Sequence, residues 1–140
     1  NWFPILVSTV LGSTFSIIIL YILGKVFGLT PDLFYATLPK SVTTAIALDI
    51  GSKFGWEGAL ITMMTVTTGI TGAVIAPLVT KFIKSPVAKG LAIGTASHAV
   101  GTAKAIEMGE VEGAMSGLAL SLAAISTSFI IPLLLTTILR

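Results

Sequence analysis

Three long uncharged runs constrain the fold of this chain more than any other feature. Residues 1–24, 58–80 and 113–139 contain no Asp, Glu, Lys or Arg. Each run is longer than the about 20 residues with which an α-helix spans the apolar core of a bilayer. Only 10% of the chain is charged, whereas about 25% is usual in a soluble domain. The sequence therefore predicts an all-α integral membrane protein.

About five membrane segments are expected from the charges and prolines, at 2–27, 31–51, 58–80, 86–109 and 113–139. Two of them carry polar interruptions, Pro39-Lys40-Ser41 within 31–51 and the stretch GTASH at 94–98 within 86–109. Lipid cannot satisfy the backbone groups that such a break exposes, so the break must be buried in protein or line a wet cavity. We therefore expect 31–51 and 86–109 to be discontinuous helices with breaks near mid-membrane.

A tandem repeat relates the two interrupted segments. VTTAIALDIG (42–51) aligns with VGTAKAIEMG (100–109) at five identical positions of ten, and WEGAL (56–60) then matches VEGAM (111–115). The alignment places Lys40 opposite His98. We expect one transmembrane domain over 1–140, with internal repeats at about 38–82 and 94–139, each a broken helix plus a full helix. Because the chain starts with Asn1 inside an apolar run, we expect the C-terminal part of a longer protein without a signal peptide.

The charges favour one of two topologies for the interrupted segments. If both cross the membrane, five basic residues share one side and two share the other, which is a positive-inside pattern. If both re-enter on the side from which they came, the two sides tie. Crossing is therefore the preferred prediction and re-entry the alternative. Crossing predicts a multi-pass cell (inner) membrane protein with the start of this chain outside and the C-terminus cytoplasmic. The five basic residues are Lys25, Lys81, Lys84, Lys89 and Arg140.

The side chains around the breaks predict a site for a small carboxylate. A helix that begins after a break presents free N–H groups and a positive dipole end, which favour an anion. Lys40 adds a charge that costs about 3 kcal/mol at a helix centre, so such a residue usually faces a cavity or a partner. The substrate-binding candidates are Lys40, Ser41, Thr43, Thr44, Thr95, Ser97, His98 and Thr102.

Some of these polar residues have simpler interpretations. The hydroxyls can bond to backbone carbonyls or pack between helices, and the spacings Gly90-x-x-x-Gly94 and Gly113-x-x-x-Gly117 predict close helix packing. His98 is the single histidine, and an unperturbed histidine changes charge between about pH 5 and 8. We therefore treat His98 as the candidate for coupling substrate movement to a proton.

Composition excludes several other classes of site. With no cysteine and one histidine, thiolate and histidine-cluster metal sites are excluded. A net charge of +2 is too small to suggest a nucleic-acid partner. No nucleophile–base pair or phosphate loop is present, so we expect neither an enzyme nor a cofactor. The expected partners are a small carboxylate, the lipid bilayer and a second copy of the chain, since small-residue faces favour helix association.

Two long motifs resemble the signatures of the LrgB/CidB family of bacterial membrane proteins. They are LPKSVTTAIALDIG (38–51) and GLAIGTASHAVGTAKAIEMGEVEGAMSGLAL (90–120). The similarity covers nearly all 140 residues and extends to the C-terminal domain of the plastidal glycolate/glycerate translocator. The chain departs from the family pattern at Ala45, where proline is expected, and at Lys104, where arginine is common.

The resemblance implies two competing functions. Bacterial members are named as holin/antiholin-like regulators of murein hydrolase activity, cell death and lysis, acting with a small LrgA/CidA-type membrane partner. The plastid relatives, and some bacterial ones, are associated with transport of small carboxylates such as glycolate, glycerate or pyruvate. Paired breaks with converging donors favour proton-coupled transport of a small monocarboxylate, because a pore for large hydrolases needs no such site. Antiholin-like regulation is the alternative.

Overall fold

The computed structural model describes residues 2–137 and contains six α-helices there. They are α1 (Trp2–Val26), α2 (Pro31–Thr37), α3 (Thr44–Lys53), α4 (Gly58–Thr80), α5 (Pro86–Met108) and α6 (Glu110–Thr137). The all-helical class is confirmed, and so are the two interruptions. Residues 38–43 separate α2 from α3, and α5 contains one non-helical residue, His98.

Three of these helices, α1, α4 and α6, are long and apolar enough to cross a membrane. They contain 25, 23 and 28 residues, and at about 1.5 Å per residue each exceeds the about 30 Å of a bilayer core. Pro77 and Pro132 lie inside α4 and α6 without ending them. The described part of the chain therefore combines three candidate spans with two discontinuous segments.

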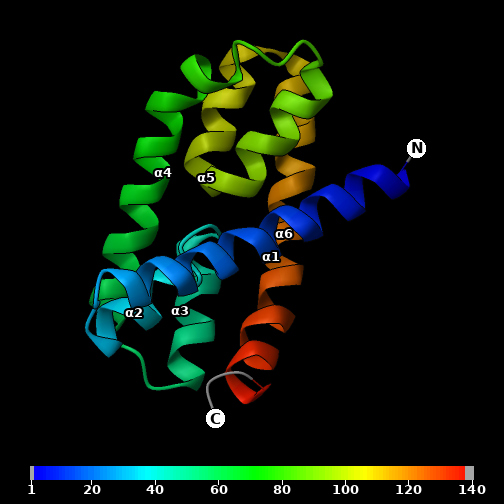
Figure 1. The fold of residues 1–140 in the computed structure, drawn as a ribbon. Helices are drawn as coiled ribbons and strands as arrows, with labels where there is room; N and C mark the ends of the chain where they lie inside the picture. The colour runs from blue at the N-terminus through cyan, green and yellow to red at the C-terminus, as the bar shows by residue number, and fades with distance from the viewer. Residues whose placement is uncertain (1, 138–140) are drawn as a thin grey trace.

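The first discontinuous segment turns back on itself between α2 and α3. Phe34 at the start of this segment and Ile50 near its end belong to the same buried cluster. Tyr35 of α2 also stacks on Trp56, just beyond α3, with ring centroids 5.5 Å apart. Contacts of this kind require the two ends of the segment to lie together. Helices α2 and α3 therefore form a hairpin, which Figure 1 shows in blue and teal.

The second discontinuous segment, α5, turns back at His98. The backbone of His98 has φ 42° and ψ −142°, a region that residues other than glycine rarely adopt. A Cβ added to Gly101 would lie 3.2 Å from the side chain of Ile93, although eight residues of straight helix would separate them by about 12 Å. Ile93 also shares a buried cluster with Ala105. The two halves of α5 therefore lie side by side (Figure 1).

These hairpins overturn the preferred topology. Each discontinuous segment begins and ends at the same end of the molecule, and the two hairpins point toward each other from opposite ends of α4 (Figure 1). The prediction that both segments cross is wrong, and the re-entrant alternative describes the fold. The charge count failed because a reversal needs only a few backbone torsions, which leave no signal in the charges. The membrane orientation stays a prediction, and Arg140, on which the count partly relied, lies outside the described residues.

A short turn connects the two arms of each hairpin. The first tip is residues 38–43, and the second tip is Ser97 with His98. Helix α4 follows the first hairpin and α6 follows the second, so the same order of elements occurs twice. This order agrees with the sequence repeat, and the bounds of the two repeats stay a prediction.

Small residues allow α6 to pack closely against both halves of α5. A Cβ at Gly90 would collide with Glu112, and one at Gly113 would collide with Ile106. Gly94 likewise lies against Ser116, as the close-packing prediction requires. Gly117 differs, because a Cβ there would have nothing within 4 Å. The remaining long helix, α1, runs across the middle of α6 rather than alongside it (Figure 1).

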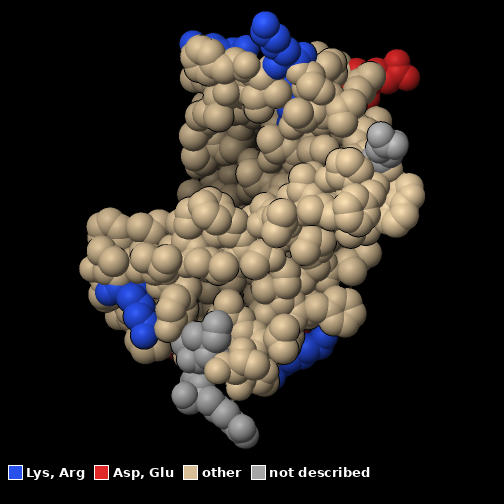
Figure 2. All heavy atoms as spheres, turned by 45° about the vertical axis from the view of Figure 1, so that its right-hand side comes forward, with Lys and Arg blue, Asp and Glu red and all other residues tan. Residues whose placement is uncertain are grey.

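Charged side chains gather toward the two ends of the molecule. Figure 2 shows lysine and acidic side chains at the ends of the visible face and a hollow in its uncharged middle. The two ion pairs between described side chains, Lys53–Asp49 and Lys104–Glu107, are partly or largely exposed and local in sequence. Lys40 of the first tip is the exception, because it is half-buried between the helices.

Candidate functional site

Lys40 of the first tip is half-buried and has no acidic partner among residues 2–137. Its Nζ donates a hydrogen bond of 3.3 Å to Ser41 Oγ. Transferring an ammonium group from water into an apolar interior is costly unless another charge compensates it. Lys40 is therefore a cation with one neutral hydrogen-bond partner, and an anion beside it would relieve that cost.

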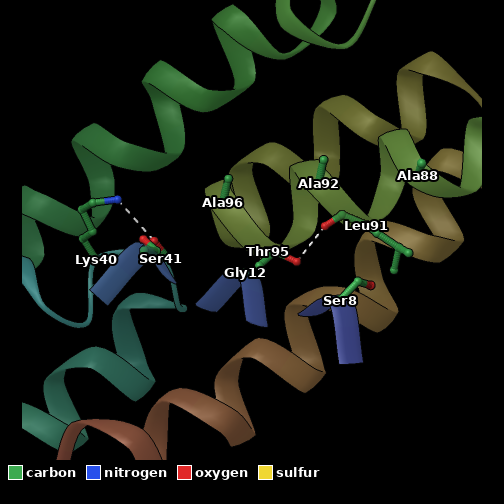
Figure 3. Close-up of a pocket in the computed structure, with 10 residues that line it drawn as sticks. Ser8, Gly12, Lys40, Ser41, Ala88, Leu91, Ala92, Thr95 and Ala96 are labelled. Carbon is green, nitrogen blue, oxygen red and sulfur yellow. Dashed lines mark hydrogen bonds between the residues drawn. The ribbon is translucent and has the colours of Figure 1, made fainter. Parts of the chain in front are cut away.

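Two cavities share Lys40 in their walls. The α1 cavity has a volume of about 430 Å³ and lies between α1, the first tip and the first half of α5. It is lined by Ser8, Gly12, Ser16, Lys40, Ser41, Thr95 and four apolar residues of α5. Figure 3 shows Lys40 and Ser41 at one side of this cavity and the α5 residues at the other.

The α4 cavity also borders Lys40 and has a volume of about 340 Å³. Its walls come from α4, with Ser97 of the second tip and Lys40 of the first. It is lined by Lys40, Met64, Thr67, Thr68, Thr71, Gly72, Ile75 and Ser97. Both volumes fall in the range of about 300–1,000 Å³ that small-molecule pockets occupy. One lysine therefore borders two spaces of small-molecule size.

Thr65 of α4 holds both tips. Its backbone oxygen accepts a hydrogen bond of 2.7 Å from His98 Nε2, so the imidazole carries its proton on that nitrogen. Its Oγ1 lies 3.1 Å from Oγ1 of Thr44, the first residue of α3. Thr65 is fully buried and His98 is 3% exposed. A single residue therefore connects the start of the helix after the first tip with the ring at the second tip.

The second tip is also fixed by glycines of α4 and by a hydroxyl pair. A Cβ at Gly69 would lie 2.5 Å from His98 Cε1, and one at Gly72 would collide with Ser97 Oγ. Thr102 Oγ1 donates to the His98 backbone oxygen at 2.9 Å and lies 2.8 Å from Ser116 Oγ of α6. The absence of side chains at two positions of α4 thus lets the turn approach the helix closely.

The eight predicted site residues divide into two groups. Lys40, Ser41, Thr95 and Ser97 line the α1 cavity, the α4 cavity or both. The others line neither cavity. They are Thr43, which caps α3, Thr44 and His98, which bond to Thr65, and Thr102, which bonds to Ser116. Direct contact of this second group with a substrate stays a prediction, as does proton coupling through His98.

Sequence reasoning missed several polar residues that border these cavities. Ser8 and Ser16 of α1 line one cavity, and Thr67, Thr68 and Thr71 of α4 line the other. All of them lie in uncharged runs that length alone assigns to lipid. The sequence signal for the α4 residues was the threonine-rich stretch TVTTGIT at 65–71. This stretch is unusually polar for a turn of helix that faces lipid, and it could have predicted a polar cavity wall. Among residues 2–137, no group of three or more His, Cys, Asp or Glu side chains is placed to hold a metal.

Comparisons with known proteins identify the family of the chain. The sequence model of the LrgB-like family matches residues 1–137. Proteins named antiholin-like protein LrgB from Bacillus mycoides, Bacillus cereus and Bacillus anthracis are each 39% identical to the chain over 134 residues. The match covers 94% of this chain and 58% of each relative, so the chain spans little more than half their length. No solved structure matches the chain. Since the family match covers nearly every residue, the chain belongs to the LrgB-like family of membrane proteins.

Proposed function

We propose that the protein containing this chain is a non-enzymatic, antiholin-like membrane protein that acts with a small LrgA/CidA-type membrane partner. Support comes from the name shared by the Bacillus relatives and from the family match over residues 1–137. The three long apolar helices are consistent with a multi-pass membrane protein. In this role the protein alters the rate at which the cell degrades its own murein.

The test of this role is an autolysis assay in cells that lack the full-length gene. We expect restored expression to slow lysis and to lower murein hydrolase activity in zymograms. An affinity tag on the protein should also recover the partner from detergent extracts. Unchanged lysis rates with normal membrane levels of the protein would refute the role.

A second function is favoured by one observation, the half-buried Lys40 between two cavities without an acidic partner among residues 2–137. We propose that Lys40 binds a small monocarboxylate, such as pyruvate or glycolate, during transport. One ammonium group compensates one negative charge, which favours a monoanion over a dianion. The hydroxyl-bearing residues Ser41 and Thr95 also line the α1 cavity and make part of its wall polar. Transport and regulation are compatible, because carboxylate flux changes the acid balance of the cell.

The test of transport is uptake of labelled pyruvate or glycolate by proteoliposomes that contain the full-length protein. We expect saturable uptake that Lys40→Gln lowers at least about tenfold, since a lost charge-assisted contact costs about 1.5–3 kcal/mol. The matched control is Lys84→Gln, because Lys84 is exposed and lies outside both cavities. Equal uptake by both variants would exclude Lys40 from the binding site.

The same vesicles distinguish transport from pore formation. A carrier should retain a trapped fluorescent dye while it takes up carboxylate. A holin-type assembly should release dyes of several sizes, in a manner that depends on the protein-to-lipid ratio. Dye release without saturable uptake would support the pore and contradict the carrier.

A further inference from the structure

We propose that the α4 cavity is a second, water-filled anion chamber, and that Lys40 separates it from the α1 cavity along one transport path. This proposal rests on the transport function above. It names the threonines of α4 as the polar wall of the chamber, a role that neither the motifs nor the family match assigns to them. The ligand is the same small monocarboxylate.

The first observation is the state of the hydroxyl groups. Most helical serines and threonines in the described chain donate to a carbonyl three or four residues earlier, as Thr62 and Thr80 of α4 do. Thr67, Thr68 and Thr71 make no such bond and have no other hydrogen-bond partner among residues 2–137. Thr67 and Thr71 are exposed and Thr68 is half-buried, so their hydroxyls are accessible from the cavity. Three accessible hydroxyls without a partner among the described residues therefore line one cavity wall, where they are free to bond to water or to an anion.

The second observation comes from the opposite wall. Ser97 of the second tip is 6% exposed, lines the same cavity, and its Oγ also has no hydrogen-bond partner among the described residues. Its Oγ lies so close to Gly72 that any side chain there would collide with it. An unpaired but accessible hydroxyl on the second tip thus faces the same cavity as α4. The chamber has hydroxyls on both sides and the ammonium group of Lys40 at the boundary with the α1 cavity.

The third observation is the position of Lys40. It is the one residue that lines both cavities. An anion that moves from the α1 cavity to the α4 cavity therefore passes the same positive charge, and serines and threonines border the space on either side. Multiple weak polar sites around a single charge allow an ion to bind without being trapped, as conduction requires.

Cysteine labelling tests the chamber directly, because the chain contains no cysteine. The experiment uses the full-length protein in sealed vesicles, with any cysteine outside this chain replaced by serine. The probe position is Thr71→Cys, and the control is Ile70→Cys on the same helix. Ile70 is 54% exposed and lines no cavity described here, and its side chain points about 100° away from that of residue 71. The reagents are an anionic and a cationic methanethiosulfonate of similar size.

We expect Thr71→Cys, which lines the chamber, to react with both reagents and Ile70→Cys, which lines neither cavity, to react with neither. Adding Lys40→Gln to Thr71→Cys should lower the ratio of anionic to cationic reaction rates at that thiol by at least about tenfold, because loss of a positive charge slows the anionic reagent and speeds the cationic one. Pyruvate should slow the anionic reaction. Equal labelling at both positions, or a rate ratio that Lys40→Gln does not change, would overturn the proposal.

An uptake arm separates failure of the chamber from failure of transport. Thr68→Val should raise the KM for pyruvate about fivefold, the equivalent of one neutral hydrogen bond. Thr62→Val is the control, because Thr62 bonds to the Gly58 carbonyl and lines neither cavity. Saturable uptake with equal KM in both variants refutes the chamber alone. Absent uptake in the unmodified protein refutes transport, while the labelling pattern still reports on the chamber.

Discussion

Replacing Gly69 by alanine tests whether the second tip depends on close approach to α4. The new methyl carbon would lie 2.5 Å from Cε1 and 2.8 Å from Nε2 of His98. The imidazole cannot retreat without giving up its 2.7 Å hydrogen bond to the Thr65 carbonyl. Gly117→Ala is the matched control, because that glycine also lies in a long helix and a Cβ there would have open space around it.

The magnitude follows from three contributions. Overpacking costs about 1–3 kcal/mol, and a buried imidazole N–H left without its acceptor costs about 1–3 kcal/mol. Alanine favours a helix over glycine by about 1 kcal/mol, and this gain applies to both variants. The free energies of unfolding of Gly69→Ala and Gly117→Ala should therefore differ by about 2–6 kcal/mol, with Gly69→Ala the less stable.

Thermal unfolding of the full-length protein in detergent measures this difference. Aliquots are heated, and the fraction that stays monodisperse is followed by fluorescence-detected size exclusion. At about 2–4 °C per kcal/mol for a chain of 150–250 residues, the midpoints should differ by about 4–24 °C. A third variant, Gly69→Ala combined with His98→Ala, removes the ring that the methyl group meets.

Two results would refute the reasoning. The first is an equal midpoint for Gly69→Ala and Gly117→Ala, which would mean that the ring is not held against α4. The second is a penalty for Gly69→Ala that is just as large in the His98→Ala background. Coupling between the two positions is the expected sign of a direct contact.

Three further predictions concern the tips and the surface. Thr44→Val and Thr102→Val should each lower the midpoint by a few degrees, since each loses about 1 kcal/mol of hydrogen bonding. A raised KM for pyruvate in these variants would support the predicted substrate contact, and an unchanged KM would leave them a purely structural role. His98→Gln should flatten the pH dependence of pyruvate uptake between about pH 5 and 8 if His98 couples a proton, and an unchanged profile would end that role. Glu107→Gln, which breaks the exposed pair with Lys104, should change stability by less than about 0.5 kcal/mol in a denaturant titration, so a larger loss would show that the pair is more than a surface contact.

The sequence predicted the discontinuities well because they have local causes. Pro39 removes a backbone donor, and Lys40 is too polar for a lipid-facing turn, so a break at 38–43 follows from two adjacent residues. Pro31 likewise marks the start of α2. The repeat then transferred the same expectation to the second tip.

The direction of the chain after each break could not be predicted in the same way. At the second tip, reversal depends on the unusual torsions of His98, and nothing in the identity of a histidine announces a positive φ. The contact that holds this conformation, the carbonyl of Thr65, comes from 33 residues away. Charges near the ends of segments report which side a loop occupies, yet they are compatible with both routes. For the same reason, the cavity-lining role of Thr67, Thr68 and Thr71 required the fold.

Thr65 has one more consequence. Because the hairpins approach it from opposite ends of the molecule, a shift of α4 along its axis by one residue, about 1.5 Å, would disturb its contacts with Thr44 and with His98 at the same time. The two hairpins therefore share one anchoring residue. A change at Thr65 alone therefore reaches both hairpins.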